Sequence, residues 1–395
     1  MSNETRTFPF RRTCPFDLAE DYAELRRTAP VVPVALRRTG ARAWLLTRHD
    51  DVGAVLTDPR FDQGNTAGGA LGGGSATAFG TALSDPVAHK RWRRVVNGVF
   101  SVRQAESVRA RIAAMVEDTL DELERAGQPG DLMADYAFRL SIRTMCVALD
   151  MPEHLATRFE DWAEGLHAVT PSFEAFTESM RVLHDTATEL VALARAQPDG
   201  LLGSLMAATD DDSTPLTDDE LVATILLLVF AGHESTAIQI GNGVYALLDH
   251  PEQLDLLRRD ESLLEPAVEE ILRYALVGTG FTGARQAPVD VDFDGVTVPA
   301  GETVLVSLDS AGRDESRVDN PERFDITRGA ARNHLSFGVG SHFCLGAPLA
   351  RVVLQEGIAR LLRRFPGLKS ATDLSAVEFT SNRFNHYPRA LRVHW

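Results

Sequence analysis

Apolar residues recur at helical spacing through much of the chain after residue 84. Segments 89–100, 108–126, 132–149 and 153–169 each have hydrophobic positions three or four residues apart. That spacing places them on one face of an amphipathic helix. Gly127 follows the second segment and is a typical stop signal. We therefore expect this part of the chain to be mainly helical.

The longest predicted helix runs from Thr217 to about Leu248. Thr217 and Glu220 have the spacing of a capping box at its start, and His250-Pro251 ends it. At 1.5 Å per residue the helix would be roughly 48 Å long, enough to cross a whole domain. The run 221–232 is apolar on all sides, which predicts burial, and it is too short to span a bilayer. We expect a buried core helix and no membrane anchor.

Strand signals are fewer and shorter than the helical ones. Residues 43–46 and 303–306 are apolar runs of strand length. Segments 291–293 and 296–298 flank Asp294-Gly295, which is a strong hairpin signal. The predicted fold class is mainly α, with small β-sheets at one side.

Composition and charge exclude several classes of protein. The 395 residues are 44% hydrophobic and 24% charged, as in ordinary globular proteins. With 40 basic and 56 acidic residues the net charge is −16, which argues against nucleic acid as a partner because phosphate binding needs a basic face. The three cysteines form no CxxC pair, and residues 1–17 lack the apolar segment of a signal peptide. We expect a cytoplasmic, soluble protein.

Residues 64–80 are rich in glycine but do not form a phosphate loop. No GxxxxGK[ST] pattern occurs there, and no strand–glycine–helix unit surrounds the segment. A long irregular segment inside a compact domain is often a lid or a binding loop. We expect that role here.

The segment from Phe337 to Arg351 carries the most specific chemistry. Its glycines let the backbone bend tightly, and apolar periodicity resumes just after Cys344. Cys344 therefore precedes a helix N-terminus, where amide groups and the helix dipole favour a thiolate. A nucleophile would need a neighbouring base, and zinc would need more ligands than His342. A single thiolate suits haem iron, whose other ligands come from a macrocycle. A buried free cysteine in a glycine turn is the alternative.

This segment resembles the cysteine loop of the cytochrome P450 family, FGxGxHxCxG, and contains all its fixed positions. Further family elements occur in the family's order: HxxxR at His89–Arg93, AGxE at 231–234, ExxR at Glu270–Arg273 and PERF at 321–324. The matches cover most of the chain, and as an ordered set they are highly specific. The resemblance implies a single haem-thiolate domain over residues 1–395, which encloses haem between the long central helix and the cysteine loop.

The resemblance also implies roles for residues around haem b (iron protoporphyrin IX). Cys344 would be the axial thiolate and the metal ligand, in a loop shaped by Gly338 and Gly346, with Phe337 packed over it. The haem propionates would be bound by four cationic or donor side chains, since arginine forks suit carboxylates. Those four are His89, Arg93, Arg285 and His342.

The family's ExxR pair is structural. Glu270 and Arg273 are three residues apart on one helix face and can pair, and Pro266 suits the first position of that helix. In the family a third residue near the cysteine loop holds the pair. We expect Arg323 in that role, with Arg328 as the rival.

On the distal side the resemblance implies a proton relay in the long helix. The small residues Ala231 and Gly232 would allow the helix to open locally, leaving a groove for O₂. Glu234 and the following alcohol would then pass protons toward the reacting oxygen. The family usually has threonine after the acid, whereas this chain has Ser235, with Thr236 next. Serine keeps the hydroxyl but lacks the methyl that restricts its rotamer.

The implied function is a haem-thiolate monooxygenase acting on a small apolar or amphipathic organic molecule and O₂. Secondary-metabolite tailoring and xenobiotic oxidation are both open. Segments 64–84 and 276–282, including Phe281, would line the substrate pocket. Electrons would come from an external ferredoxin or flavodoxin, which is acidic, so we expect a basic proximal face on a monomer. Its candidate residues are Arg93, Arg94, Arg103 and Arg351.

Three other functions stay open on the sequence alone. The same fold can catalyse oxidative coupling, peroxide-driven oxidation or nitric oxide reduction. A haem-binding sensor without turnover would use the same cysteine loop. A cysteine-nucleophile enzyme without haem would use Cys344 differently.

Overall fold

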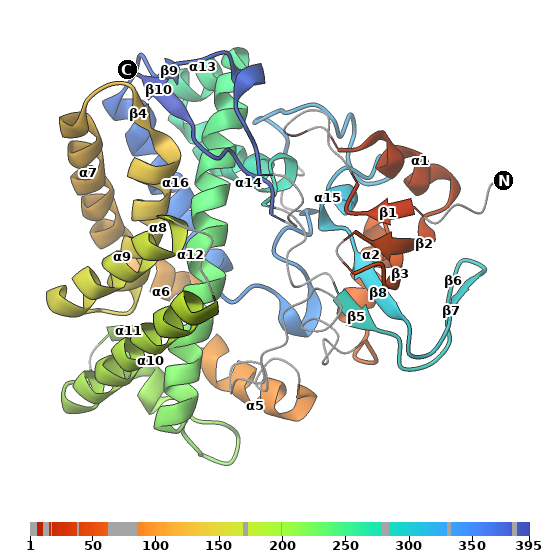
Figure 1. Ribbon diagram of the computed structural model, residues 1–395, viewed down its shortest axis with the longest axis horizontal. Coiled ribbons are helices and arrows are strands. Elements are labelled where there is room, and N and C mark those ends of the chain that lie inside the picture. The colour runs from red at the N-terminus through yellow and green to blue at the C-terminus, as the bar shows by residue number, and fades with distance from the viewer. Residues whose placement is uncertain are drawn as a thin grey trace.

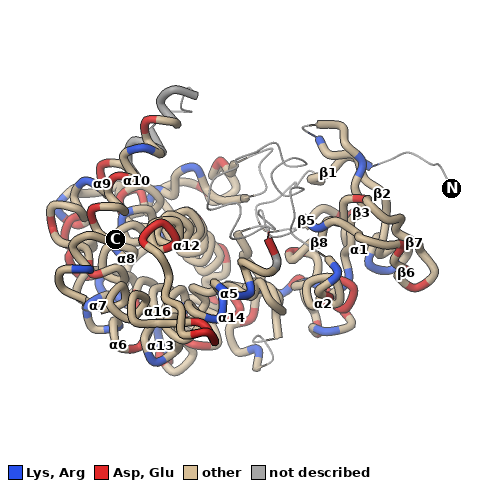
Figure 2. The backbone as a smooth tube through the Cα atoms, turned by 90° about the horizontal axis from the view of Figure 1, so that it is seen from below, with Lys and Arg blue, Asp and Glu red and all other residues tan. Residues whose placement is uncertain are grey.

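The computed structural model describes residues 6–10, 16, 18–37, 39–61, 85–168, 173–198, 200–277, 284–329, 333–380 and 385–395. Figure 1 shows two parts side by side, a bundle of helices and a smaller part rich in strands. Acidic and basic residues are interspersed along both parts (Figure 2). The predicted fold class, mainly helical with small sheets on one side, is confirmed.

Helix α12 (Asp218–Asp249) runs through the whole height of the helical part (Figure 1). Its start is the predicted capping box: Thr217 Oγ1 accepts from the backbone N–H of Glu220, and the Glu220 carboxylate accepts from the backbone N–H of Thr217. The helix is long and apolar enough to cross a membrane, but half of its most apolar window is buried inside the protein. That burial identifies α12 as a core helix.

Helices from distant parts of the sequence pack around α12 and share one hydrophobic core with it. They are α7 (Arg109–Ala126), α8 (Phe138–Ala148), α14 (Leu264–Tyr274) and α16 (Ala347–Arg364). A short π-helix (Leu132–Ala137) leads into α8, and Asp131 caps it. The predicted segment 132–149 is therefore helical from Leu132 to Ala148, with a change of helix type at Phe138.

A second hydrophobic cluster lies at the N-terminal half of α12. It contains residues of α8 and α12 and of four further helices, α5 (Pro86–Asn97), α9 (Glu153–Ala168), α10 (Phe173–Ala196) and α11 (Gly200–Ala207). Two shorter helices, α6 (Val102–Ser107) and α13 (Pro251–Arg259), follow α5 and α12 in the chain. The helical predictions near 89–100, 108–126 and 153–169 are confirmed to within a few residues.

The strand-rich part is built on a mixed five-stranded sheet in the order β1-β2-β3-β8-β5. The strands are β1 (Arg6–Phe8), β2 (Val31–Leu36), β3 (Arg42–Leu46), β5 (Ala284–Gln286) and β8 (Thr303–Val306). Strand β3 pairs with β8 in parallel although 256 residues separate Leu46 from Thr303. Helices α1 (Glu20–Thr28), α2 (His49–Thr57) and α15 (Leu308–Ala311) lie beside this sheet (Figure 1).

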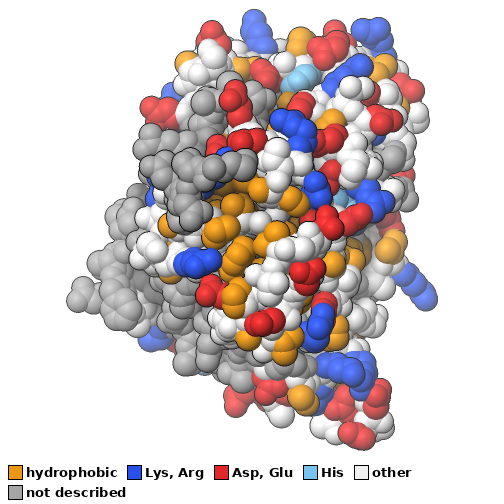
Figure 3. Space-filling model, turned by 90° about the vertical axis from the view of Figure 1, so that its right-hand side faces the viewer, with side chains coloured by type: hydrophobic (Ala, Val, Ile, Leu, Met, Phe, Trp, Pro, Cys, Tyr) orange, Lys and Arg blue, Asp and Glu red, His pale blue; other side chains and the backbone are white. Residues whose placement is uncertain are grey.

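The predicted hairpin forms between β6 (Val291–Phe293) and β7 (Val296–Val298). Its turn residues Asp294 and Gly295 both have positive φ, 51° and 88°. Two positive φ values define a type I′ turn, whose twist matches paired strands. Figure 3 looks onto this side of the molecule and shows hydrophobic side chains gathered among charged ones.

The three-stranded sheet lies at one end of the helical part, beside the C-terminus (Figure 1), and consists of β4 (Gly130–Asp131), β10 (Arg392–His394) and β9 (Lys369–Ser370). One prediction about helix starts is wrong. A 3₁₀ turn (Glu261–Leu263) leads directly into α14, so Pro266 is the third residue of the helix and not the first. Proline is tolerated there because the first-turn N–H groups have no partner within the helix. The glycine-rich segment 64–80 and Phe281 lie outside the described residues.

Candidate active site

The loop from Phe337 to Ala347 holds Cys344 in a tightly bent backbone. Gly338 and Gly340 have positive φ, 67° and 82°, where side chains with a Cβ are strained. A Cβ on Gly340 would lie 2.5 Å from the carbonyl oxygen of Leu56, so α2 packs directly on the loop. The Cys344 amide donates to the carbonyl of Phe337 at 2.8 Å, which closes the loop. The loop is thus fixed by glycine geometry and by its own backbone hydrogen bond.

The Cys344 sulfur faces the N-terminus of α16, as the sequence predicts. Burial raises the pKa of the Cys344 thiol, while the amides of Gly346 and Ala347 and the charges of Arg93 and Arg351 lower it. The net direction is upward. A bound metal ion would replace the thiol proton, and the two amides would then soften the thiolate charge.

Four side chains predicted to bind carboxylates come together beside this loop. His89 on α5 is buried and stacks on His342, with ring centroids 4.1 Å apart and planes 11° from parallel. Arg93, one turn later, donates to the carbonyl of Phe343. Arg285 on β5 is also buried, and its guanidinium donates to the carbonyl of Ala284 at 2.9 Å.

The electrostatics of this cluster call for an anion. Burial lowers the pKa of His342, and the positive groups His89, Arg285 and Arg93 lower it further, to about 3. Burial likewise lowers the pKa of Arg93. Positive groups that are crowded together out of water repel each other, and a bound carboxylate relieves that repulsion.

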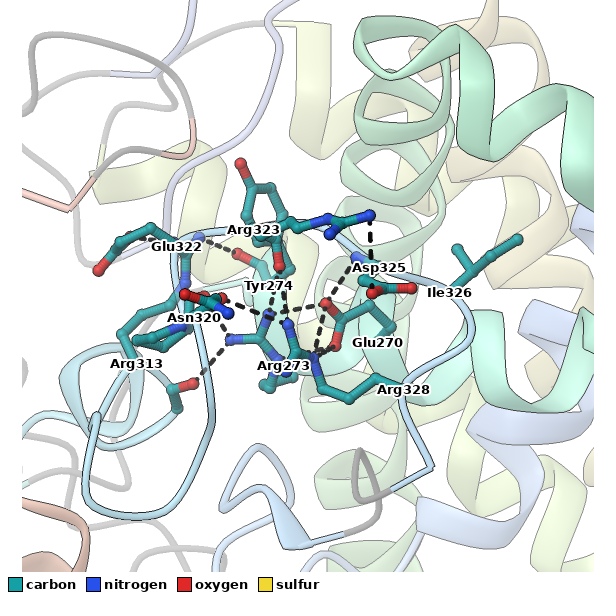
Figure 4. A network of polar contacts seen from close by, with 12 residues as sticks. Glu270, Arg273, Tyr274, Arg313, Asn320, Glu322, Arg323, Asp325, Ile326 and Arg328 are labelled. Carbon is teal, nitrogen blue, oxygen red and sulfur yellow. Dashed lines mark hydrogen bonds and ion pairs between the residues drawn. The ribbon is translucent and has the colours of Figure 1, made fainter.

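A buried ion pair lies on helix α14 (Figure 4). Arg273 and Glu270 on α14 form two parallel hydrogen bonds of 2.8 and 2.7 Å, and both side chains are almost fully buried. Arg273 also donates to the carbonyls of Gly312 and Pro321 at 2.9 Å. The Glu270 carboxylate accepts from the amide of Asp325 at 2.9 Å. The pair thereby fixes the loop that precedes the cysteine segment.

The third member of this network is Arg328, and the prediction of Arg323 is wrong. Arg328 Nε lies 3.4 Å from Glu270, and its side chain is 12% exposed. Arg323 contributes only its backbone carbonyl to Arg273, at 3.2 Å, while its side chain is 67% exposed and points toward Asp325. The PERF segment passes the ion pair with its backbone, which turns the Arg323 guanidinium outward.

Helix α12 is continuous through Ala231–Thr236, so the expected local opening is not seen. The Ser235 hydroxyl donates to the carbonyl of Ala231 at 2.6 Å, one turn back. Such back-bonding keeps the side chain against the helix and often bends it. Glu234, Ser235 and Thr236 are all half-buried.

The family model for Cytochrome P450 matches residues 26–373 of this chain. The chain belongs to the cytochrome P450 family. It is 38% identical over 398 residues to nocardicin C N-oxygenase of Nocardia uniformis subsp. tsuyamanensis, covering 99% of each protein. It is 36% identical over 399 residues to the mycinamicin IV hydroxylase/epoxidase of Micromonospora griseorubida, covering 100% of both.

Solved structures agree with this membership. The LnmA cytochrome P450 hydroxylase from the leinamycin biosynthetic pathway of Streptomyces atroolivaceus S-140 has a TM-score of 0.87 and 37% identity. That similarity covers 99% of this chain and 100% of the other. The protein is thus a cytochrome P450, a haem-dependent oxidoreductase of the monooxygenase type.

The described residues of this P450 fit haem. The thiol with two amides aimed at its sulfur suits the iron, and the cationic cluster suits two propionates. Phe230 and Ala231 are exposed in the middle of α12, next to the buried Val229, so they offer an apolar surface for a flat macrocycle. Haem would supply the activation of O₂, which no amino-acid side chain performs.

One residue at this site has no signal in the sequence. Ser141 on α8 is fully buried, and its Oγ lies 2.8 Å from Nδ1 of His233. The same hydroxyl donates to the His233 carbonyl. Because the hydroxyl proton is used there, Nδ1 must donate to Ser141 Oγ, which fixes the tautomer of His233.

The predicted basic face is mostly neutralised within the P450. Arg94 pairs with Asp211, Arg351 forms a two-point pair with Glu269, and Arg93 donates to the cysteine loop. Arg103 on α6 is exposed, and no ion pair to it occurs among the described residues. An apolar cavity of about 30 Å³ lies between α6 and the start of α16, lined by Phe100, Ala105, Leu345 and Leu349 among others.

Proposed function

We propose that this P450 inserts one atom of O₂ into a small apolar or amphipathic organic molecule of the secondary-metabolite class. The other oxygen atom leaves as water, with two electrons and two protons. The observation that carries the proposal is the thiol of Cys344 facing two amides at the start of α16, beside a cluster built for carboxylates. The relatives named above act on nocardicin C and mycinamicin IV, which supports the substrate class.

In this proposal Cys344 is the axial ligand, and Phe337, Gly338 and Gly346 shape its loop. His89, Arg93, Arg285 and His342 bind the propionates. Their convergence from α5, β5 and the cysteine loop supports that role, since separate elements rarely bring positive groups together without an anion. The whole chain would then be one haem-thiolate domain.

Ala231 and Gly232 would lie at the haem face, and Glu234, Ser235 and Thr236 would handle protons. Glu234 is half-buried on α12 and would bring protons inward from water. Ser235 Oγ would pass a proton on when it leaves the Ala231 carbonyl, which a hydroxyl achieves by rotating. Thr236 offers a second hydroxyl one residue later.

The electron donor would be an acidic ferredoxin or a flavodoxin, in the cytoplasm, and the P450 would act as a soluble monomer. Arg103 on α6 would attract the donor, since its charge is exposed and without an ion pair in the described part of the chain. Phe343, 41% exposed, and Val102, 66% exposed, would give it apolar contact near the cysteine loop.

Labelled O₂ tests the reaction most sharply. Purified protein would be screened for compounds that shift its spin state, and a binder would be turned over with NADH and a surrogate ferredoxin and reductase. We expect one labelled atom in the product. Product without label would indicate oxidative coupling, and a binder without NADH consumption would indicate a sensor.

A further inference from the structure

A second buried carboxylate lies directly beside the ExxR pair. Glu269 on α14 is 3% exposed at its side chain and accepts two hydrogen bonds from Arg351 on α16. The Nε–Oε1 distance is 2.6 Å and the Nη2–Oε2 distance is 2.9 Å. This two-point geometry fixes the plane of the Arg351 guanidinium.

His334 completes the set around Glu269. Its Nε2 lies 3.3 Å from Glu269 Oε2, and its side chain is 1% exposed. The amide of Ser336 donates to His334 Nδ1 at 3.1 Å, so Nδ1 carries no proton and the proton is on Nε2, which lies beside the carboxylate without an aligned hydrogen bond to it. The Ser336 hydroxyl donates to the carbonyl of Leu272 at 2.8 Å, which ties this segment to α14 as well.

The guanidinium held in this way lies over Phe337. Arg351 Cζ is 4.6 Å from the centre of the Phe337 ring, within the range of a cation–π contact. The His334 ring centre is 6.1 Å from the same ring. The backbone carbonyl of Phe337 accepts the amide of Cys344. A chain of contacts thus runs from Glu269 through Arg351 and Phe337 to the cysteine.

We propose that Arg351, held by Glu269, is a positioning residue that fixes Phe337 and through it the Cys344 loop, and that it is not a contact for the electron donor. The inference rests on the proposed function, in which Cys344 binds haem iron. A donor contact needs a charge that is free to meet the partner, and a rim charge acts mainly on association rate. The Arg351 charge is instead compensated by a buried carboxylate inside the protein.

The planar guanidinium is what this role requires. It stacks on the ring and presents a two-point fork to Glu269, whereas a lysine ammonium offers only a point charge. Replacing arginine by lysine therefore separates positioning from charge. Lysine would preserve the positive charge near Cys344 but would lose the stacked, planar contact.

The experiment compares the haem reduction potential and the spectrum of the reduced CO complex in Arg351→Gln, Arg351→Lys, Phe337→Leu and the double variant Arg351→Gln/Phe337→Leu. We expect both Arg351 variants to shift the potential in the same direction as Phe337→Leu. The double variant should shift it no further than Phe337→Leu alone. Restoration of the wild-type potential by lysine, or additive shifts in the double variant, would overturn the proposal. If Arg351→Gln does not fold, Arg351→Lys is compared with Phe337→Leu in the same way.

Arg103→Gln is the matched control, because Arg103 is an exposed arginine on α6, a helix that packs against α16, which carries Arg351. It should leave the potential unchanged but reduce the ionic-strength dependence of electron transfer from the ferredoxin. Arg351→Gln should leave that ionic-strength dependence unchanged. A loss of salt dependence in Arg351→Gln equal to that in Arg103→Gln would show that Arg351 is a docking residue. Failure of the proposed function would look different, since wild type itself would then lack a haem-thiolate spectrum.

Discussion

Ser141 Oγ lies 2.8 Å from Nδ1 of His233, which hydrogen-bonds α8 to the residue just before Glu234. The hydroxyl also donates to the His233 carbonyl. In a regular helix that carbonyl accepts the amide of Ala237 alone, so here it is shared. Ser141 thus ties the predicted relay segment of α12 to the neighbouring helix.

We predict that Ser141→Ala loosens this part of α12. In the variant the buried Nδ1–H of His233 loses the Ser141 hydroxyl as its acceptor. We expect this loss to lower the free energy of unfolding by about 1–3 kcal/mol. Hydrogen exchange of peptides covering residues 231–237 should speed up, and the melting temperature should fall. Thr144→Val is the matched control, because the buried Thr144 hydroxyl donates within α8, to the carbonyl of Leu140, and bonds to no other helix among the described residues. Equal exchange in the two variants would contradict the bridging role.

Arg328 and Arg323 should differ sharply in their effect on stability. Arg328→Ala removes a partner of a fully buried carboxylate, so we expect a loss of about 1–3 kcal/mol and a lower haem content. Arg323→Ala removes a side chain that is 67% exposed and should change stability by less than about 0.5 kcal/mol. Melting curves and haem-to-protein ratios measure both. A larger effect at Arg323 would reverse the assignment.

Ser235→Ala should divert electrons from product to hydrogen peroxide. Without the hydroxyl, protons no longer reach the reacting oxygen by way of Ser235, and the reduced oxygen escapes. We expect peroxide per NADH consumed to rise several-fold while substrate binding, followed by the spin shift, stays the same. Thr236→Val tests the neighbouring hydroxyl. If only Thr236→Val raises the peroxide yield, the relay runs through Thr236.

The buried Glu269 makes a specific contribution to acid stability. Burial alone would raise the pKa of Glu269, but the neighbouring His334 and the hydrogen bonds and charge of Arg351 lower it from 4.5 to about 2. A lowered carboxyl pKa stabilises the folded state above the unfolded pKa, and the gain is lost as the pH falls through the folded pKa. Above pH 4.5 the Glu269 carboxylate adds about 3 kcal/mol to the free energy of unfolding, since each tenfold change in proton affinity is worth about 1.4 kcal/mol.

Relative to wild type, the Glu269→Gln variant should therefore lose most stability at neutral pH. The difference in urea midpoint between the variant and wild type should narrow as the pH falls from 4.5 toward 2. Glu117→Gln is the control, because Glu117 pairs with Arg360 at the surface with its side chain 41% exposed. A difference that stays constant with pH would show that Glu269 is not held as a carboxylate.

Local signals in the sequence were sufficient for the elements that depend on short-range chemistry. The capping box of α12 needs only Thr217 and Glu220, and the type I′ turn needs only Asp294 and Gly295. The cysteine loop is equally local, since its glycines and Cys344 lie within one segment. The capping box and the turn are confirmed, because few neighbours compete with the local preference.

Contacts between distant segments could not be read in this way. Ser141 and His233 are 92 residues apart, and Arg351 and Glu269 are 82 apart. Nothing in either segment marks its partner, because hydrogen bonding depends on how the helices pack. Arg323 shows the same limit. The PERF motif places Arg323 in the sequence beside the ion pair, but the path of the backbone decides where the Arg323 guanidinium points.

The central claim is that Cys344 binds haem iron as a thiolate. The spectrum of the reduced CO complex tests it directly, because only an axial thiolate shifts the Soret band strongly to the red. We predict the red-shifted band in the wild-type protein and its loss in Cys344→Ser. A colourless wild-type protein, or a red-shifted band that survives in Cys344→Ser, would contradict the account.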